Sequence, residues 1–204
     1  MNTLRAQAVT DGSNLGACDF FEKMSNVIIV HGVGGNPGKD WFPWLKKELE
    51  LAGCNVLAPQ FPTPENQTLD KWFAVFEKYS GYLNDVILIG HSLGGCFILN
   101  LLEKFTAKAA FLVASVSGPL DNEFDEGMKT FSHKKFDWEK IKSNCKKFYV
   151  FHSNNDPYIP LKDAENLARE LGVGLTLIRN GKHLNRDAGY AKFRELLEAV
   201  KKIL

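Results

Sequence analysis

The chain has 204 residues, of which 45% are hydrophobic and 24% are charged, and its formal net charge at pH 7 is +1. This is the composition of a globular domain that can bury a core without disulfides or metal. The near-neutral charge gives no electrostatic basis for binding nucleic acid or an anionic membrane, and no apolar run is long enough to span a bilayer.

Residues 1–24 are polar and lack periodicity, so they predict a loosely ordered N-terminal extension in front of a single domain over 25–204. They have no continuous apolar core of the kind found in signal peptides. The four cysteines are scattered, without a Cys-x-x-Cys pair, which argues against both a metal site and a disulfide framework. We therefore expect a cytoplasmic protein without metal or cofactor, as a monomer or weak homodimer.

Short apolar runs alternate with helical patterns along the rest of the chain. In chain order they predict a strand over 26–30, a helix over 41–51, a strand over 55–58, a helix over 67–80, a strand over 85–90, a helix over 93–105, a strand over 109–114, a charged, aromatic-rich insertion with one or two short helices over 118–145, a strand over 147–151, a helix over 161–171, a strand over 174–178 and a helix over 188–203. Strands that are apolar throughout are buried on both faces. The pattern predicts a three-layer α/β fold with a mostly parallel central sheet and a short lid insertion.

The segment Gly90-His-Ser92-Leu-Gly94 joins the strand over 85–90 to the helix that follows. A glycine–serine–glycine turn between strand and helix is typical of a nucleophile elbow, in which the serine hydroxyl is lifted out of the sheet. The glycines lie where a Cβ would collide with neighbouring backbone. The helix N-terminus offers free N–H groups to a developing oxyanion. We predict Ser92 as nucleophile and the Leu93 N–H as an oxyanion donor.

A serine nucleophile needs a base, and the base needs a carboxylate to orient it. Enzymes with such an elbow carry serine, acid and histidine in that chain order, on loops that follow strands. Asp156 follows the strand over 147–151 and His183 follows the strand over 174–178. They are the predicted acid and base. The alternatives are that Asp156 only begins a turn before Pro157 and that His183 is an ordinary loop histidine.

The glycine-rich loop 31–38 directly follows the first strand. A loop at this place supplies the second oxyanion donor in such enzymes, and we assign that donor to the Val33 N–H. The competing interpretation, a phosphate-binding loop, fails because neither phosphate-binding glycine spacing is present. Trp41 and Phe42 come next and are candidates for an acyl pocket, with packing in the core as the alternative.

Together these motifs resemble the small α/β-hydrolases of the retinoblastoma-binding protein nine family and its bacterial serine-hydrolase counterparts. The resemblance covers residues 25–203 and rests on the loop at His31, on Trp41-Phe-Pro-Trp44-Leu, on the Ser92 turn, on Asn-Asp156-Pro-Tyr-Ile-Pro160, and on His183. It implies a single-domain α/β-hydrolase fold with a minimal lid and a Ser92–Asp156–His183 triad.

Two departures from the family pattern stand out. Lys182 occupies the position directly before the histidine, where family members usually have glycine. The Leu-x-Cys-x-Glu motif associated with binding a pocket protein is absent from the sequence, so that partner is not expected.

The expected function is hydrolysis of small carboxylic esters, or of related acyl substrates, through an acyl-enzyme intermediate. Thioesterase or aminopeptidase-like activity on the same triad is an alternative, because specificity is set by the pocket and not by the triad. A non-catalytic protein-binding scaffold is the remaining alternative.

Overall fold

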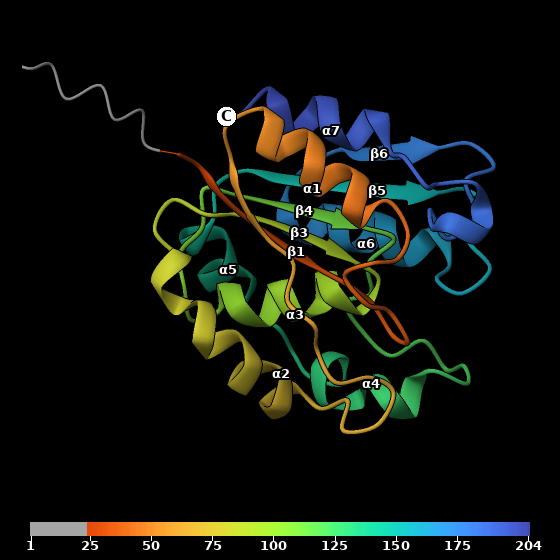
Figure 1. The fold of residues 1–204 in the computed structure, drawn as a ribbon. Helices are drawn as coiled ribbons and strands as arrows, with labels where there is room; N and C mark the ends of the chain where they lie inside the picture. Colours follow the sequence, from red (N-terminus) through yellow and green to blue (C-terminus); the bar gives the residue numbers. More distant parts are fainter. Residues whose placement is uncertain (1–23) are drawn as a thin grey trace, which may run out of the picture.

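The centre of the computed structural model, which describes residues 24–204, is a sheet of six parallel strands (Figure 1). The strands are β1 (Asn26–Val30), β2 (Asn55–Leu57), β3 (Ile87–His91), β4 (Ala109–Val113), β5 (Phe148–Ser153) and β6 (Leu175–Ile178). Their order across the sheet is β2-β1-β3-β4-β5-β6. The chain therefore leaves β1 toward one edge and β3 toward the other. In open parallel sheets, ligands bind at the carboxyl ends of the strands at such a switch point.

Helices cover both faces of this sheet (Figure 1). One face carries α1 (Phe42–Leu51) and α7 (Arg194–Lys201), which contact each other. The other face carries α2 (Leu69–Phe76), α3 (Leu93–Leu102), α4 (Asp125–Ser132), α5 (Trp138–Asn144) and α6 (Leu161–Leu171). The predicted three-layer α/β architecture is confirmed, and all six described strands are parallel.

The inner strands β1, β3 and β4 have nearly unbroken apolar sequences because both of their faces are covered. Along β1, Ile28 and Val30 join the core shared with α3, whereas Val27 and Ile29 join the core shared with α1 and α7. Side chains alternate between the two faces of a strand, so each core receives every second residue. A strand buried in this way has no polar face.

Helix α3 is the most deeply buried helix of the fold. All ten of its residues are buried, so it lacks the polar stripe of a surface helix. It packs against β1, β3 and β4 on one side and against α4 and α5 on another. The residue that precedes it, Ser92, is therefore mounted on a helix with little freedom to move.

Two predicted helices differ from the structure at their ends. The helix predicted over 67–80 is α-helical only to Phe76 and continues as a 3₁₀ helix over Glu77–Tyr82, a stretch that includes the poor helix formers Ser80 and Gly81. The helix predicted over 188–203 begins only at Arg194. Gly189 adopts φ +92° and ends a short 3₁₀ helix over Arg186–Ala188 before α7 can start.

The insertion predicted over 118–145 divides into two parts. Its first part, through α4, packs on α3 and reaches the cavity described below. Its second part, α5, contacts α3 and α6 and belongs to the crossover from β4 to β5, so the lid prediction is wrong for α5.

Most of the extension predicted over 1–24 lies outside the described residues. Within residues 24–204, no helix has the length and apolar character needed to cross a membrane.

Candidate active site

Ser92 stands at the turn between β3 and α3 with φ 55° and ψ −123°. Residues other than glycine rarely adopt such angles, which store strain. Two glycines permit the turn: a Cβ at Gly90 would lie 2.6 Å from the Gly94 backbone, and a Cβ at Gly94 would lie 2.3 Å from the Val30 carbonyl oxygen. The Ser92 N–H donates to the Val113 carbonyl oxygen at 2.9 Å, which ties the turn to β4.

The glycine-rich loop presents the Val33 N–H beside this serine. The Gly32 carbonyl oxygen accepts from His31 Nδ1 at 2.9 Å and from the Gly35 N–H at 3.1 Å. Because the C=O and N–H of a trans peptide point in opposite directions, these bonds turn the Val33 N–H away from the loop interior. A Cβ on Gly32 would lie only 2.8 Å from Ser92 Cβ, so the loop rests against the nucleophile.

The N–H groups of Val33 and Leu93, the two predicted oxyanion donors, donate to no acceptor within residues 24–204. Leu93 is the first residue of α3, where no intrahelical acceptor exists for its N–H. Both free donors belong to residues close to the nucleophile, since Leu93 directly follows Ser92 and Val33 directly follows Gly32, which rests against Ser92. Such a pair can stabilise negative charge on an oxygen bound between them.

His31 has a definite tautomer that sequence reasoning did not reveal. Its Nε2 accepts a hydrogen bond from the Phe61 N–H at 3.0 Å, so the proton is on Nδ1, which donates to the Gly32 carbonyl oxygen. Burial lowers the pKa of His31, which keeps the ring neutral. Its ring also packs edge-on against Phe61 and Trp72. His31 therefore holds the loop that carries the Val33 N–H.

Asp156 and His183 form a buried pair. Asp156 Oδ2 accepts from His183 Nδ1 at 2.8 Å, and the Asp156 side chain is fully buried. Asp156 Oδ1 accepts from the Tyr158 and Ile159 N–H groups at 2.9 and 3.2 Å. Burial acts to raise the pKa of Asp156, but the His183 hydrogen bond and charge and the two N–H groups outweigh it and lower the pKa. Asp156 is thus an ionised acceptor that orients His183 through Nδ1.

The loop before Asp156 holds the loop before His183 by side-chain hydrogen bonds. Three consecutive backbone N–H groups donate to three consecutive side chains: Asn180 to Asn154 Oδ1 at 2.7 Å, Gly181 to Ser153 Oγ at 2.9 Å and Lys182 to Asn155 Oδ1 at 2.8 Å. The Asp156–His183 pair continues the series by one residue. We call these contacts, between residues 153–156 and 180–183, the acid–histidine clamp.

The histidine loop needs such support because its backbone is strained. Asn180, Lys182 and Leu184 have φ of 57°, 47° and 51°. The left-handed conformation costs about 1–2 kcal/mol for a residue with a Cβ and persists only when neighbours enforce it. Lys182, which stands where the family usually has glycine, therefore adopts a conformation that favours glycine, and the clamp holds its backbone there.

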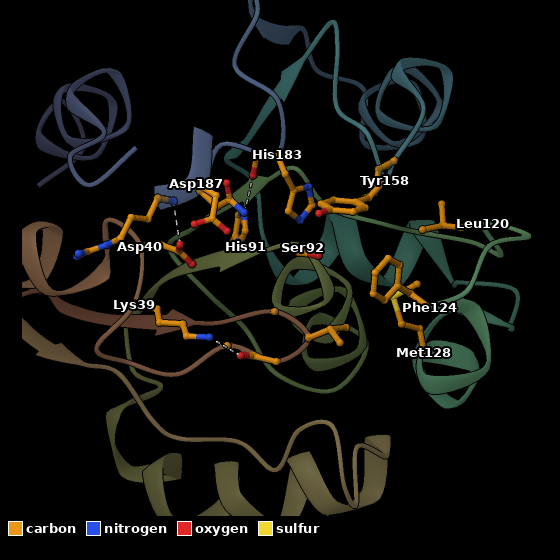
Figure 2. Close-up of a pocket in the computed structure, with 17 residues that line it drawn as sticks. Lys39, Asp40, His91, Ser92, Leu120, Phe124, Met128, Tyr158, His183 and Asp187 are labelled. Carbon is orange, nitrogen blue, oxygen red and sulfur yellow. Dashed lines mark hydrogen bonds between the residues drawn. The ribbon is translucent and has the colours of Figure 1, made fainter. Parts of the chain in front are cut away.

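Two further donors reach the histidine loop from below. His91 Nε2 donates to the His183 carbonyl oxygen at 2.9 Å, and Trp41 Nε1 donates to the Leu184 carbonyl oxygen at 3.0 Å (Figure 2 shows the first bond). Burial, and then the neighbouring His183, lower the pKa of His91 to about 4, so its ring is neutral near pH 7. The His91 side chain therefore lies directly beneath His183 and supports the histidine loop.

Trp41 and Phe42 do not form the acyl pocket for which they were candidates. Both side chains are at most 1% exposed and lie in the core shared by β1, α1 and α7. The packing alternative is therefore the right one. Both rings stand edge-on to His91, because the start of α1 lies under the end of β3.

A cavity of about 350 Å³ opens over Ser92, with His183 at its wall (Figure 2). One side of it is largely apolar and comes from the loop before α4, α4 itself and the acid loop: Leu120, Phe124, Met128, Tyr158 and Ile159. The other side is polar and comes from the two residues after the glycine-rich loop and from the segment after His183: Lys39, Asp40, Asn185, Arg186 and Asp187. Two cationic and two anionic side chains leave the polar side without net formal charge.

The structure brings Ser92, Val33 and His183 to this one cavity, with Asp156 bonded behind the histidine. Within residues 24–204, no hydrogen bond joins Ser92 Oγ to His183. Catalytic hydrogen bonds are often long in the absence of substrate, so this arrangement remains compatible with general-base catalysis.

The other histidines do not enter the cavity. His133 pairs with Asp125 at 3.0 Å on α4, and His152 Nε2 donates to the Ile159 carbonyl oxygen at 3.1 Å. The described residues contain no group of three or more histidine, cysteine or acidic side chains that could hold a metal ion.

Comparison with known proteins gives a consistent picture. The chain is 30% identical to the serine hydrolase RBBP9 of Rattus norvegicus over 183 residues, which cover 88% of this chain and 96% of the rat protein. It is 30% identical to YdeN of Bacillus subtilis over 171 residues, covering 80% of this chain and 88% of YdeN.

Solved structures show the same fold. The crystal structure of the Bacillus subtilis ydeN gene product matches with a TM-score of 0.83 at 26% identity, covering 88% of this chain and 98% of that chain. Est1E from Butyrivibrio proteoclasticus, solved with ferulic acid bound, matches with a TM-score of 0.68 at 19% identity, covering 89% and 88%. A family model described as serine hydrolase matches residues 27–202. The chain therefore belongs to the serine hydrolase family and has the α/β-hydrolase fold.

Proposed function

We propose that this hydrolase cleaves small carboxylic esters through an acyl-enzyme intermediate on Ser92. The observation that carries the proposal is the meeting, at one cavity, of a strained serine, a histidine bonded to a buried carboxylate, and Val33 with its free N–H. A second free N–H, on Leu93, directly follows the serine. Each part has a separate chemical task in acyl transfer, and the parts come from four different loops.

The tautomer of His183 assigns the direction of proton transfer. Its Nδ1 proton is donated to Asp156, which leaves Nε2 as the basic nitrogen. In the proposed reaction, Ser92 Oγ attacks the ester carbonyl while Nε2 takes the hydroxyl proton, and Nε2 then returns the proton to the leaving alcohol. The N–H groups of Val33 and Leu93 stabilise the oxyanion. Water, activated by the same nitrogen, releases the acid and restores Ser92.

The cavity suggests the size of the substrate. At about 30 Å³ for each water-sized group, about 350 Å³ holds roughly a dozen groups, which is near the lower limit for ligand pockets. We place a short or aromatic acyl group along the apolar side, against Phe124 and Met128. The polar side, with its balanced charges, suits a neutral and hydrated leaving alcohol.

The test combines covalent labelling with turnover. Intact mass is measured after exposure to a fluorophosphonate, and rates are measured on p-nitrophenyl esters of increasing acyl length. We expect a single adduct, and turnover that falls beyond medium chain length. Ser92→Ala should lose the adduct and nearly all turnover. Ser143→Ala, which changes an exposed serine of α5, is the matched control and should behave like the parent.

The outcomes separate the alternatives. An adduct with slow ester turnover but rapid cleavage of thioesters or aminoacyl amides would keep the nucleophile and replace the substrate class. A well-folded protein that forms no adduct would refute the proposal and favour a binding scaffold.

A further inference from the structure

Two consecutive carbonyl oxygens of the histidine loop each receive a hydrogen bond from a ring nitrogen in the sheet core. His91 Nε2 donates to the His183 oxygen at 2.9 Å and Trp41 Nε1 donates to the Leu184 oxygen at 3.0 Å. We propose that His91 and Trp41 are positioning residues, which aim His183 at Ser92 by holding the backbone on which the imidazole is mounted. This inference rests on the proposed function, because it assigns His183 the role of base.

The backbone at His183 is held unevenly without these two donors. The acid–histidine clamp binds N–H groups up to Lys182, and Asp156 binds the imidazole itself. Lys182 and Leu184, on either side of His183, both have positive φ. Within residues 24–204, His91 and Trp41 are the only donors to the carbonyl oxygens of 183 and 184. Without them, the peptide between His183 and Leu184 keeps only the bond from the Leu184 N–H to the Gly181 carbonyl oxygen at 3.0 Å. The peptide between Leu184 and Asn185 then has no hydrogen bond within residues 24–204.

The geometry of the ring pair supports a positioning role. The His91 and His183 ring centroids are 4.8 Å apart, and Tyr158 stands edge-on to His183 at 4.9 Å. The imidazole thus lies between these two rings (Figure 2). Asp156 accepts from its Nδ1. Small errors in such a position matter, because a displacement of about 1 Å at a reacting group can cost on the order of 100-fold in rate.

An uncharged hydrogen-bond donor at position 91 suits a residue that lies beneath the catalytic histidine. His183 becomes an imidazolium during acyl transfer, and a permanent positive charge beneath it would oppose that step. His91 is 4% exposed and enclosed by the Trp41 and Phe42 rings, so it donates an N–H without carrying charge. Lysine or arginine would supply the hydrogen bond together with an unfavourable charge.

The test separates the effect of the His91 N–H donor from the effect of its aromatic ring. His91→Phe keeps an aromatic ring but removes the N–H, whereas His91→Gln keeps a donor near the Nε2 position. We expect His91→Phe to lower kcat about 10- to 100-fold with KM changed less than about threefold, and His91→Gln to recover most of kcat. Trp41→Phe, which removes only the second donor, should lower kcat by about 10-fold and carries the test if His91→Phe does not fold.

Leu49→Ala is the control for a general loss of stability, which could lower kcat without any change in the position of His183. Leu49 is fully buried in the same core and lies in the last turn of α1, at the opposite end of that helix from Trp41, and its side chain has no N–H to donate. This variant should lower Tm at least as much as His91→Phe and leave kcat within about twofold. If His91→Phe and Trp41→Phe fold and also retain kcat within twofold, the inference is overturned.

A second measurement is independent of turnover. The His183 Nδ1 proton, bonded to Asp156, should give a low-field proton resonance in the parent and in Leu49→Ala. We expect this resonance to broaden or vanish in His91→Phe, because the ring loses its fixed orientation. An unchanged resonance in His91→Phe would contradict positioning even if the protein proved not to hydrolyse esters. If the parent protein itself did not hydrolyse esters, that result would contradict the proposed function and not the positioning role.

Discussion

The nucleophile turn and the histidine loop both hold a strained residue, but they do so by opposite means. At Ser92 the strain is accommodated by the absence of side chains, since Gly90 and Gly94 occupy places where a Cβ would collide with backbone. At His183 the strain is restrained by the presence of side chains, which accept and donate hydrogen bonds around residues 180–184.

This difference has consequences for how each region can fail. At the nucleophile turn there is no room for an added atom, so a single methyl group at Gly90 or Gly94 should destabilise the fold itself. A hydrogen-bonded clamp loses its members one at a time, so its loss should reduce catalysis gradually. The glycines of the steric turn each lie two residues from Ser92 in sequence, although Gly94 also meets the Val30 backbone. The clamp instead joins residues that are 26 to 28 apart.

The largest effect is expected at the steric turn. The Cβ of Gly94→Ala would lie 2.3 Å from the Val30 carbonyl oxygen, and backbone cannot withdraw as a flexible side chain can. We expect a loss of about 3 kcal/mol or more in the free energy of unfolding, at or above the upper end of overpacking costs. Urea unfolding measures it. Gly174→Ala, at an exposed glycine with no atom within 4 Å of the added Cβ, should change stability by less than about 0.5 kcal/mol. Equal effects at the two positions would refute the steric account.

Acid should destabilise the fold through His91, which connects the two regions. The unfolded chain binds a proton at this residue below about pH 6.5, while the folded chain, with the pKa at about 4, does not. The contribution of His91 to the free energy of unfolding is therefore fully present well above pH 6.5 and is lost progressively as the pH falls towards 4. Between pH 7 and 5 the loss is about 2 kcal/mol. His183, Asp40 and Asp156 also face this ring.

The measurement compares unfolding free energies at pH 7, 6 and 5 for the parent and His91→Phe. The parent should lose about 2 kcal/mol more than the variant over this range, because phenylalanine does not titrate. Parallel pH profiles for the two proteins would show that His91 is not kept neutral by the fold.

A smaller effect is expected when one member of the clamp is removed. Ser153→Ala leaves the buried Gly181 N–H without its acceptor, which should cost about 1–2 kcal/mol and lower kcat several-fold. Fluorophosphonate labelling should slow in parallel, because the base is displaced while Ser92 is not. Ser143→Ala again serves as the control. Unchanged kcat with reduced stability would mean that the clamp supports folding alone.

The smallest expected effect is a gain in stability. Lys182 has φ 47°, a conformation that glycine adopts without strain. Lys182→Gly should therefore raise the free energy of unfolding by about 0.5 kcal/mol, after subtraction of the backbone entropy that glycine adds to the unfolded chain. Thermal unfolding measures the change, and a clear decrease would show that the Lys182 side chain contributes contacts that outweigh its backbone strain.

Much of the fold could be predicted because its signals are local. Parallel strands buried on both faces leave unbroken apolar runs, and the runs around Ile28, Leu88 and Phe111 are of this kind. Helix ends were less accurate: Gly189 delays the start of α7 to Arg194, which periodicity alone does not indicate. The lid prediction failed for α5 because a crossover helix and a lid helix of similar length have similar patterns.

The position of Ser92 followed from the order of residues alone, since the glycine spacing that permits its backbone angles lies within a few residues of it. The roles of Trp41 and His91 were decided by packing. Their acceptors are 143 and 92 residues away along the chain, at carbonyl groups that carry no side-chain signature. The sequence pattern does not distinguish an aromatic ring that lines a pocket from one that supports a catalytic loop. Only the assembled core establishes which carbonyl oxygen each ring nitrogen meets.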